Sequence, residues 1–127
     1  MRLRRKVRHA VFFASTSGRE PVREWLQAME PGDRKAIGLD VAKLEFGASL
    51  HPPLCKKVGG GLWEVRTRLP RRRIARVFFL LEGTTIVLLH GFVKKARKAP
   101  DKELKLARQR QSLWEDDDAQ EEEPAPR

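Results

Sequence analysis

The side chains best suited to act on a phosphate group lie in one segment, residues 59–98. They are four cations, Arg66, Arg76, Lys94 and Lys95, and two acid–base groups, Glu64 and His90. A guanidinium binds a phosphate through two parallel hydrogen bonds, and fixed cations stabilise a negative charge that develops in a transition state. These residue types do not by themselves identify an enzyme, but they allow one mechanism, cleavage of an RNA phosphodiester, in which the 2′-hydroxyl attacks the adjacent phosphorus.

The proton carrier for such a reaction is open between Glu64 and His90. A lone histidine in an apolar strand is more often structural than catalytic. Arg76 also has a structural alternative, because an arginine in mid-strand can pair with the nearby carboxylate of Glu64. Further contacts to RNA are expected from Arg68, Arg73, Phe92, Lys57 and Arg97.

Phe92 offers a ring on which a base can stack, and its alternative role is that of an ordinary core residue. The sequence contains no spaced set of metal ligands and no cofactor motif, so we expect neither a metal nor a cofactor. The single cysteine, Cys55, excludes a disulfide framework.

The charge of the chain is divided unevenly along its 127 residues. Residues 1–114 carry 26 basic and 10 acidic side chains, a net charge of +16, and are expected to form one domain. Such a body attracts polyanions. Residues 115–127 hold seven acids and one base without apolar periodicity, which predicts a disordered tail. The tail either aids solubility or folds back on the cationic face as a mimic of a polyanion.

No window of the sequence is long and apolar enough to span a membrane. The apolar run 10–14 near the N-terminus is shorter than the core of a signal peptide. We therefore expect a cytoplasmic protein that does not engage membranes.

The elements that must position these side chains follow from the apolar periodicity. It predicts strands over 7–14, 54–58, 62–69, 74–81 and 85–93, helices over 19–29 and 33–46, and a last helix from about 101 to 114. Ser17 and Glu20 have the spacing of a capping box at the first helix. The strand 85–93 is the most apolar and is predicted to be the centre of the sheet.

This order predicts an α+β fold, a twisted and mainly antiparallel sheet with two N-terminal helices on one face and a C-terminal helix. We expect the helices to cover a single face, over Trp63, Val65, Val77 and Phe79. The opposite face, with Arg66 and Arg76, is then free for a ligand.

Three segments together carry a resemblance to a known family. LWEVR at 62–66, ARVFF at 75–79 and LHGFVKK at 89–95, followed by a helix, resemble the HigB-type toxins of the RelE/ParE superfamily, in its phage-derived branch. The resemblance covers residues 7–114 and implies a RelE-like fold. It also implies a toxin of a type II toxin–antitoxin system, whose partner is a helix-turn-helix antitoxin.

The resemblance further implies a metal-independent endoribonuclease that cuts mRNA in the A site of the ribosomal 30S subunit. By position, the basic residues of the family fall on Arg66, Arg76, Lys94 and Lys95. Relatives often place a tyrosine or histidine near the site, whereas this chain has no tyrosine. The superfamily also contains gyrase-directed members, and a non-catalytic module that binds nucleic acid or protein is a further alternative.

Overall fold

The structure is a computed structural model that describes residues 5–94 and 101–122, and it confirms the α+β fold. Three helices and five strands follow one another in the predicted order. They are β1 (His9–Phe12), α1 (Pro21–Gln27), α2 (Pro31–Glu45), β2 (Cys55–Gly59), β3 (Leu62–Leu69), β4 (Arg73–Glu82), β5 (Thr85–Lys94) and α3 (Asp101–Glu122).

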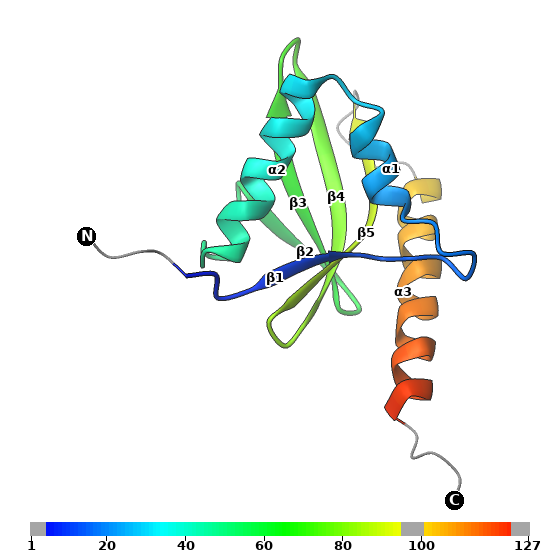
Figure 1. Ribbon diagram of the computed structural model, residues 1–127. Coiled ribbons are helices and arrows are strands. Elements are labelled where there is room, and N and C mark those ends of the chain that lie inside the picture. The colour runs from blue at the N-terminus through cyan, green and yellow to red at the C-terminus, as the bar shows by residue number, and fades with distance from the viewer. Residues whose placement is uncertain (1–4, 95–100, 123–127) are drawn as a thin grey trace, which may run out of the picture.

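All five strands belong to one sheet with the order β1-β5-β4-β3-β2 (Figure 1). The strands β2 to β5 form an antiparallel meander, and β1 pairs with β5 in parallel. The prediction that the strand 85–93 lies at the centre is wrong, because β2 adds beyond β3 and leaves β4 in the middle. Residues 75–80 of β4 are accordingly all buried.

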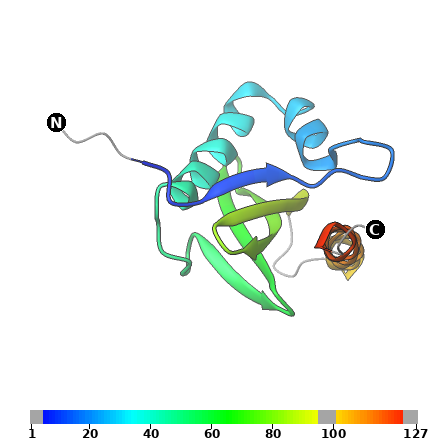
Figure 2. The same cartoon turned by 60° about the horizontal axis from the view of Figure 1, so that its bottom comes forward.

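Helices cover both faces of the sheet, so the expectation of one free cationic face is also wrong (Figure 2). Under α1 and α2 the core includes Val65, Val77 and Phe79, as predicted, and Trp63 packs at its margin. The other face buries a second apolar cluster against α3, made of Phe13, Leu62, Phe78, Leu80, Val87, Leu89, Phe92 and Ala107. The near-continuous apolar run in β4 is the sequence signal of a strand buried on both sides.

A β-bulge in β5 determines which side chains reach the α3 face. Phe78 pairs with His90 and Phe79 with Leu88, so Leu89 is an extra residue of β5 that has no partner on β4. Without the bulge, the side chains would alternate strictly from Leu89 onward, and those of residues 91 and 93 would point toward α3. The bulge instead turns His90, Phe92 and Lys94 to that face, the same face as Arg76.

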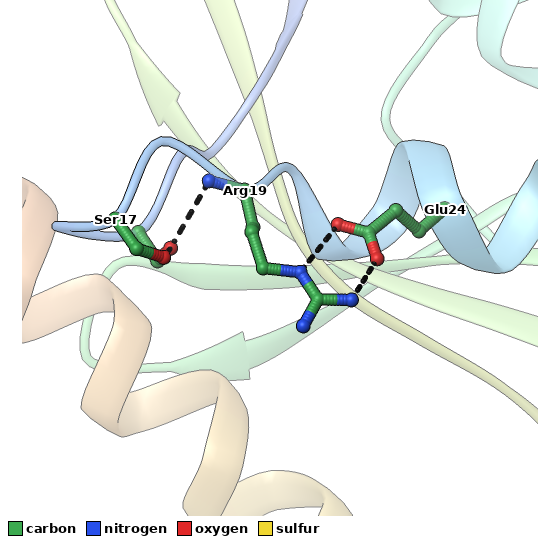
Figure 3. Close-up of polar contacts among 4 residues, drawn as sticks. Ser17, Arg19 and Glu24 are labelled. Atoms are coloured by element: carbon green, nitrogen blue, oxygen red, sulfur yellow. Dashed lines mark hydrogen bonds and ion pairs between the residues drawn. The ribbon is translucent and has the colours of Figure 1, made fainter.

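The segment before α1 is held by side-chain contacts that differ from the predicted capping box (Figure 3). The N-cap of α1 is Glu20, which makes no capping hydrogen bond, and the hydroxyl of Ser17 lies 2.9 Å from that of Ser15. Arg19 binds the carboxylate of Glu24 through Nε at 3.1 Å and through Nη2. Pro21 at the first helical position supplies the start signal instead.

The last helix is longer than predicted, because residues 115–122 continue α3 as a helix where disorder was expected. Several side chains attach α3 to the sheet. Among them, Arg108 donates to the carbonyl of Gly59 at 2.7 Å, Gln111 to that of Gly60 at 2.6 Å, and Trp114 to Glu82 at 3.0 Å. Among the described residues, no helix combines the length and apolarity that crossing a membrane requires.

Candidate functional site

A hollow of about 370 Å³ opens on the α3 face of the sheet, beside the first turn of α3. We call it the cationic hollow and define it by its lining residues, Lys56, Lys57, Val58, Glu64, Arg66, Arg76, Phe78, Lys94, Asp101 and Leu104. Five of these side chains are basic and two are acidic. The excess of positive charge gives the hollow a potential that attracts anions.

Glu64 lies between the two arginines of the hollow. Arg66 and Arg76 are cross-strand partners on β3 and β4, and each donates a hydrogen bond of 2.8 Å to the same oxygen, Oε1 of Glu64. Glu64 is 3% exposed and Arg76 is 7% exposed. The ion pair between Arg76 and Glu64, the structural alternative for Arg76, is therefore present. It uses Nη1 of the guanidinium and leaves Nε without a hydrogen-bond partner among the described residues.

Two buried donors in the hollow have no hydrogen-bond partner among the described residues, Nε of Arg76 and Nζ of Lys94. An unsatisfied buried donor is costly, and charged ones most of all. Burial of Lys94 lowers the pKa of its ammonium group, and the positive charge of Arg76 lowers it further. An anion in the hollow would supply both missing partners.

His90 lies outside the cationic hollow, and both of its ring nitrogens are engaged by α3. Arg110 Nη1 lies 3.1 Å from Nδ1, and Nε2 contacts the carboxylate of Glu103. Because a guanidinium only donates, Nδ1 accepts and the proton of the neutral ring sits on Nε2, where it donates to Glu103. This arrangement orients the ring and occupies both positions that a general base would use; a catalytic role for His90 stays a prediction.

Phe92 belongs to the apolar cluster under α3 rather than to an open surface. It is 8% exposed, and its ring packs 5.7 Å from that of Phe78 and 6.0 Å from that of His90, measured between centroids. The position matches the alternative of an ordinary core residue, and stacking on a base stays a prediction.

The remaining predicted residues lie in different places. Lys57 lines the hollow with its Nζ 6.0 Å from the ring centroid of Trp63. Arg68 is exposed on β3 and is not among the residues that line the hollow. Arg73 forms a two-bonded ion pair with Asp33 of α2, at 2.8 and 3.2 Å. Lys95 and Arg97 lie outside the described residues.

Sequence reasoning missed Lys56 and Asp101 as lining residues. Lys56 is the cross-strand partner of Glu64, which only the register of β2 reveals, and Asp101 arrives with the first turn of α3. In the described part of the chain, no group of three or more His, Cys, Asp and Glu side chains is placed to hold a metal ion. Cys55 is fully buried, and its burial raises the pKa of the thiol to about 11, so it offers no ready nucleophile.

Comparison with known proteins identifies a family. A search of curated proteins finds no match. A family model described as phage derived protein Gp49-like (DUF891) matches residues 24–112, which include α2, the meander β2–β5 and most of α3. Because the match covers more than half of the sequence, the chain belongs to the Gp49-like family of phage-derived proteins, a family of RelE-like, toxin-type proteins.

Proposed function

We propose that this protein is a HigB-type toxin of a type II toxin–antitoxin system and acts as a ribosome-dependent endoribonuclease. Membership in a family of toxin-type proteins supports the class. The observation that carries the activity is the pair of unsatisfied buried donors, Arg76 Nε and Lys94 Nζ, in a hollow that also holds the carboxylate of Glu64. These groups match what a scissile phosphate needs: two charged donors for its oxygens and a proton acceptor beside them.

In the proposed reaction the 2′-oxygen of the RNA forms a bond to phosphorus as the bond from phosphorus to the 5′-oxygen breaks. Arg76 and Lys94 bind the non-bridging oxygens and stabilise the negative charge that grows on them. Glu64 accepts the proton of the 2′-hydroxyl, and Lys94 donates a proton to the departing 5′-oxygen. The lowered pKa of Lys94 suits it to that donation. The products are a 2′,3′-cyclic phosphate and a 5′-hydroxyl.

The proposed partners are a cognate helix-turn-helix antitoxin and mRNA in the A site of the 30S subunit. The toxin class of the family supports an antitoxin. The positive charge of the hollow supports an RNA substrate.

Induced expression in a bacterial host tests the proposal. The wild-type protein should stop growth and leave translated mRNAs with new 5′ ends, while Arg76→Ala and Lys94→Ala variants should permit growth. Arg19→Ala is a matched control, because it also removes one cation, and within the described residues Arg19 forms its ion pair with Glu24 at an exposed site. It should remain toxic. Circular dichroism shows whether each purified variant is folded. A cleavage assay with and without ribosomes shows whether cleavage depends on the ribosome.

Three outcomes would contradict the proposal. Intact mRNA together with an induced DNA-damage response would favour the gyrase-directed alternative. Toxicity that survives both Arg76→Ala and Lys94→Ala would show that the hollow is not the active site, and growth that is unaffected by the wild-type protein would favour a non-catalytic module.

The proton acceptor is tested by comparing Glu64→Gln with His90→Gln, with cleavage expressed per folded molecule. Loss of a general base lowers the rate by about 10²–10⁴-fold, and we expect that loss for Glu64→Gln. His90→Gln should cleave within about tenfold of the wild-type rate, because both nitrogens of the ring are already bound by α3. The reverse result would assign the base to His90.

A further inference from the structure

The turn between β3 and β4 carries arginines in a backbone conformation that does not favour them. Residues 70–72 connect the strands, and Arg71 and Arg72 have φ values of 63° and 58°. Tight hairpins with two successive positive φ angles usually place Asn-Gly there, since Asn and Gly tolerate this conformation best. Strained positions of this kind persist where the side chain serves another purpose.

The two arginines are free to bind a ligand. Both are exposed, and neither forms an ion pair with any residue in the described ranges 5–94 and 101–122. We call Pro70, Arg71 and Arg72 the hairpin tip.

The base of the hairpin tip is fastened to the body of the protein by Arg73. Its Nε donates to the carbonyl of Pro70 at 3.1 Å, and its two terminal nitrogens bind Asp33 of α2. One of the two acids near the tip, Asp33, is thus already neutralised, and Glu30 is the other. Exposed cations of α2, Arg34 and Lys35, follow Asp33 directly, so the charge around the tip is positive. A fixed base and free arginines at the end form a preorganised binding element.

The hairpin tip and the cationic hollow lie toward the same end of β3 and β4, but Pro70, Arg71 and Arg72 are not among the residues that line the hollow. Arg71 follows Arg66 by five residues, which is at most about 17 Å of extended chain. Lys94 is the cross-strand partner of Ile74, so the hollow opens toward the end of the sheet from which the tip extends. A polyanion with several phosphates could contact both places at once.

We propose that the hairpin tip is a second RNA-binding site, which grips the sugar–phosphate backbone of a folded RNA while the cationic hollow receives the strand that is cut. The choice of RNA as the polyanion rests on the proposed function. Guanidinium groups suit this role because they bind phosphate oxygens in pairs, and A-form RNA is recognised mainly through its shape and backbone. The arginines recognise no base, so the site should be insensitive to sequence.

The test measures equilibrium binding of a 2′-O-methylated RNA stem-loop by the double variant Arg71→Gly/Arg72→Gly. The methylated 2′-oxygen cannot attack, so binding is measured whether or not the protein is a nuclease. Glycine adopts the positive φ angles of the turn without strain, and the melting temperature should therefore stay close to that of the wild type. The double variant Arg19→Ala/Arg23→Ala removes the same charge from α1 and the segment before it.

The expected result is a shallower salt dependence for the tip variant alone. Two lost phosphate contacts should reduce the slope of log K against log salt by about 1.4–1.8, so that wild-type affinity falls about 7–12-fold more than that of the variant between 50 and 200 mM salt. The control pair should keep the wild-type slope.

Three results would overturn the proposal. The first is a tip variant with the wild-type slope, and the second is a control variant that loses as much as the tip variant. The third is an equal loss on a DNA hairpin of the same sequence, which would indicate a general polyanion site. Failure of the proposed nuclease is separate, because it would appear as lost cleavage with this RNA binding unchanged.

Discussion

Arg66 and Arg76 stand directly opposite each other on β3 and β4, and their guanidinium groups share a single carboxylate oxygen of Glu64. Like charges at directly opposed positions of an antiparallel pair destabilise the sheet. The carboxylate compensates them while leaving part of the Arg76 guanidinium open. Glu64 thus holds two cations in one place.

Replacing Glu64 with Gln should destabilise the fold as well as lower activity. Removing one partner of a buried ion pair leaves the other charge uncompensated and typically costs about 3–5 kcal/mol. Urea unfolding should therefore show a large loss in the free energy of unfolding. Glu24→Gln is the control, because its pair with Arg19 is exposed, and its unfolding curve should match the wild type. Equal curves for Glu64→Gln and wild type would mean that the carboxylate does not hold the arginines together.

Much of this fold follows from local sequence. The order of all eight elements was predicted, because most of them have an apolar period and Gly or Pro residues stand near their ends. The faces of β3 were also assigned correctly, since Trp63 and Val65 alternate with Glu64 and Arg66. What could not be predicted are the non-local choices: which strand lies in the centre, and which face α3 covers.

The grouping of side chains at the candidate site was predicted in part. Arg66, Arg76 and Glu64 were predicted to share one face of the sheet, because side chains alternate between the two faces along both paired strands of a hairpin. Lys94 shares their face only because of the bulge at Leu89, a one-residue shift that leaves no local sequence signal. The contact of His90 with Glu103 depends on the docking of α3 and could not be foreseen from either segment alone.

Replacing Lys94 with Met should stabilise the protein while it abolishes cleavage. A buried ammonium without a hydrogen-bond partner among the described residues is costly, and an apolar side chain of similar length removes that cost, for a gain of about 1 kcal/mol or more. Chemical denaturation at neutral pH measures the gain. The exposed Lys105→Met is the control and should change little. A less stable Lys94→Met variant would show that the ammonium has a partner after all.

The difference in stability between the wild type and Lys94→Met should change with pH in one direction. Burial and Arg76 lower the pKa of Lys94 in the folded state below the usual 10.5, so the unfolded chain binds the proton more tightly. The stability of the wild type relative to Lys94→Met must then rise with pH between the lowered value and 10.5. Unfolding curves across the alkaline range test this. A difference that stays constant or falls as the pH rises would contradict the lowered pKa.

Replacing Gly91 with Ala should loosen α1 from the sheet. A Cβ at Gly91 would lie 2.4 Å from Cζ3 of Trp25, closer than packed atoms approach, and the ring belongs to the short helix α1. Overpacking of this kind costs about 1–3 kcal/mol, measured by thermal unfolding. Gly38→Ala is the matched control, because it faces open space on α2 and should stabilise the helix by about 0.5–1 kcal/mol. Unchanged stability in Gly91→Ala would mean that Trp25 moves aside without cost.

Removing residues 115–127 should leave the salt dependence of RNA binding unchanged. The cationic hollow lies at the first turn of α3, next to Asp101, and Glu115 follows about 21 Å further along the helix axis. Figure 1 shows this end of α3 extending beyond the sheet, and Trp114 holds the preceding turn against Glu82. The slope of log K against log salt counts phosphate contacts, and none of those proposed here involves residues 115–127. A control that keeps the length but neutralises Glu115, Asp116 and Asp117 separates charge from helix length. A slope that steepens by one contact or more in both variants would instead mean that the acidic end competes with RNA for the cations.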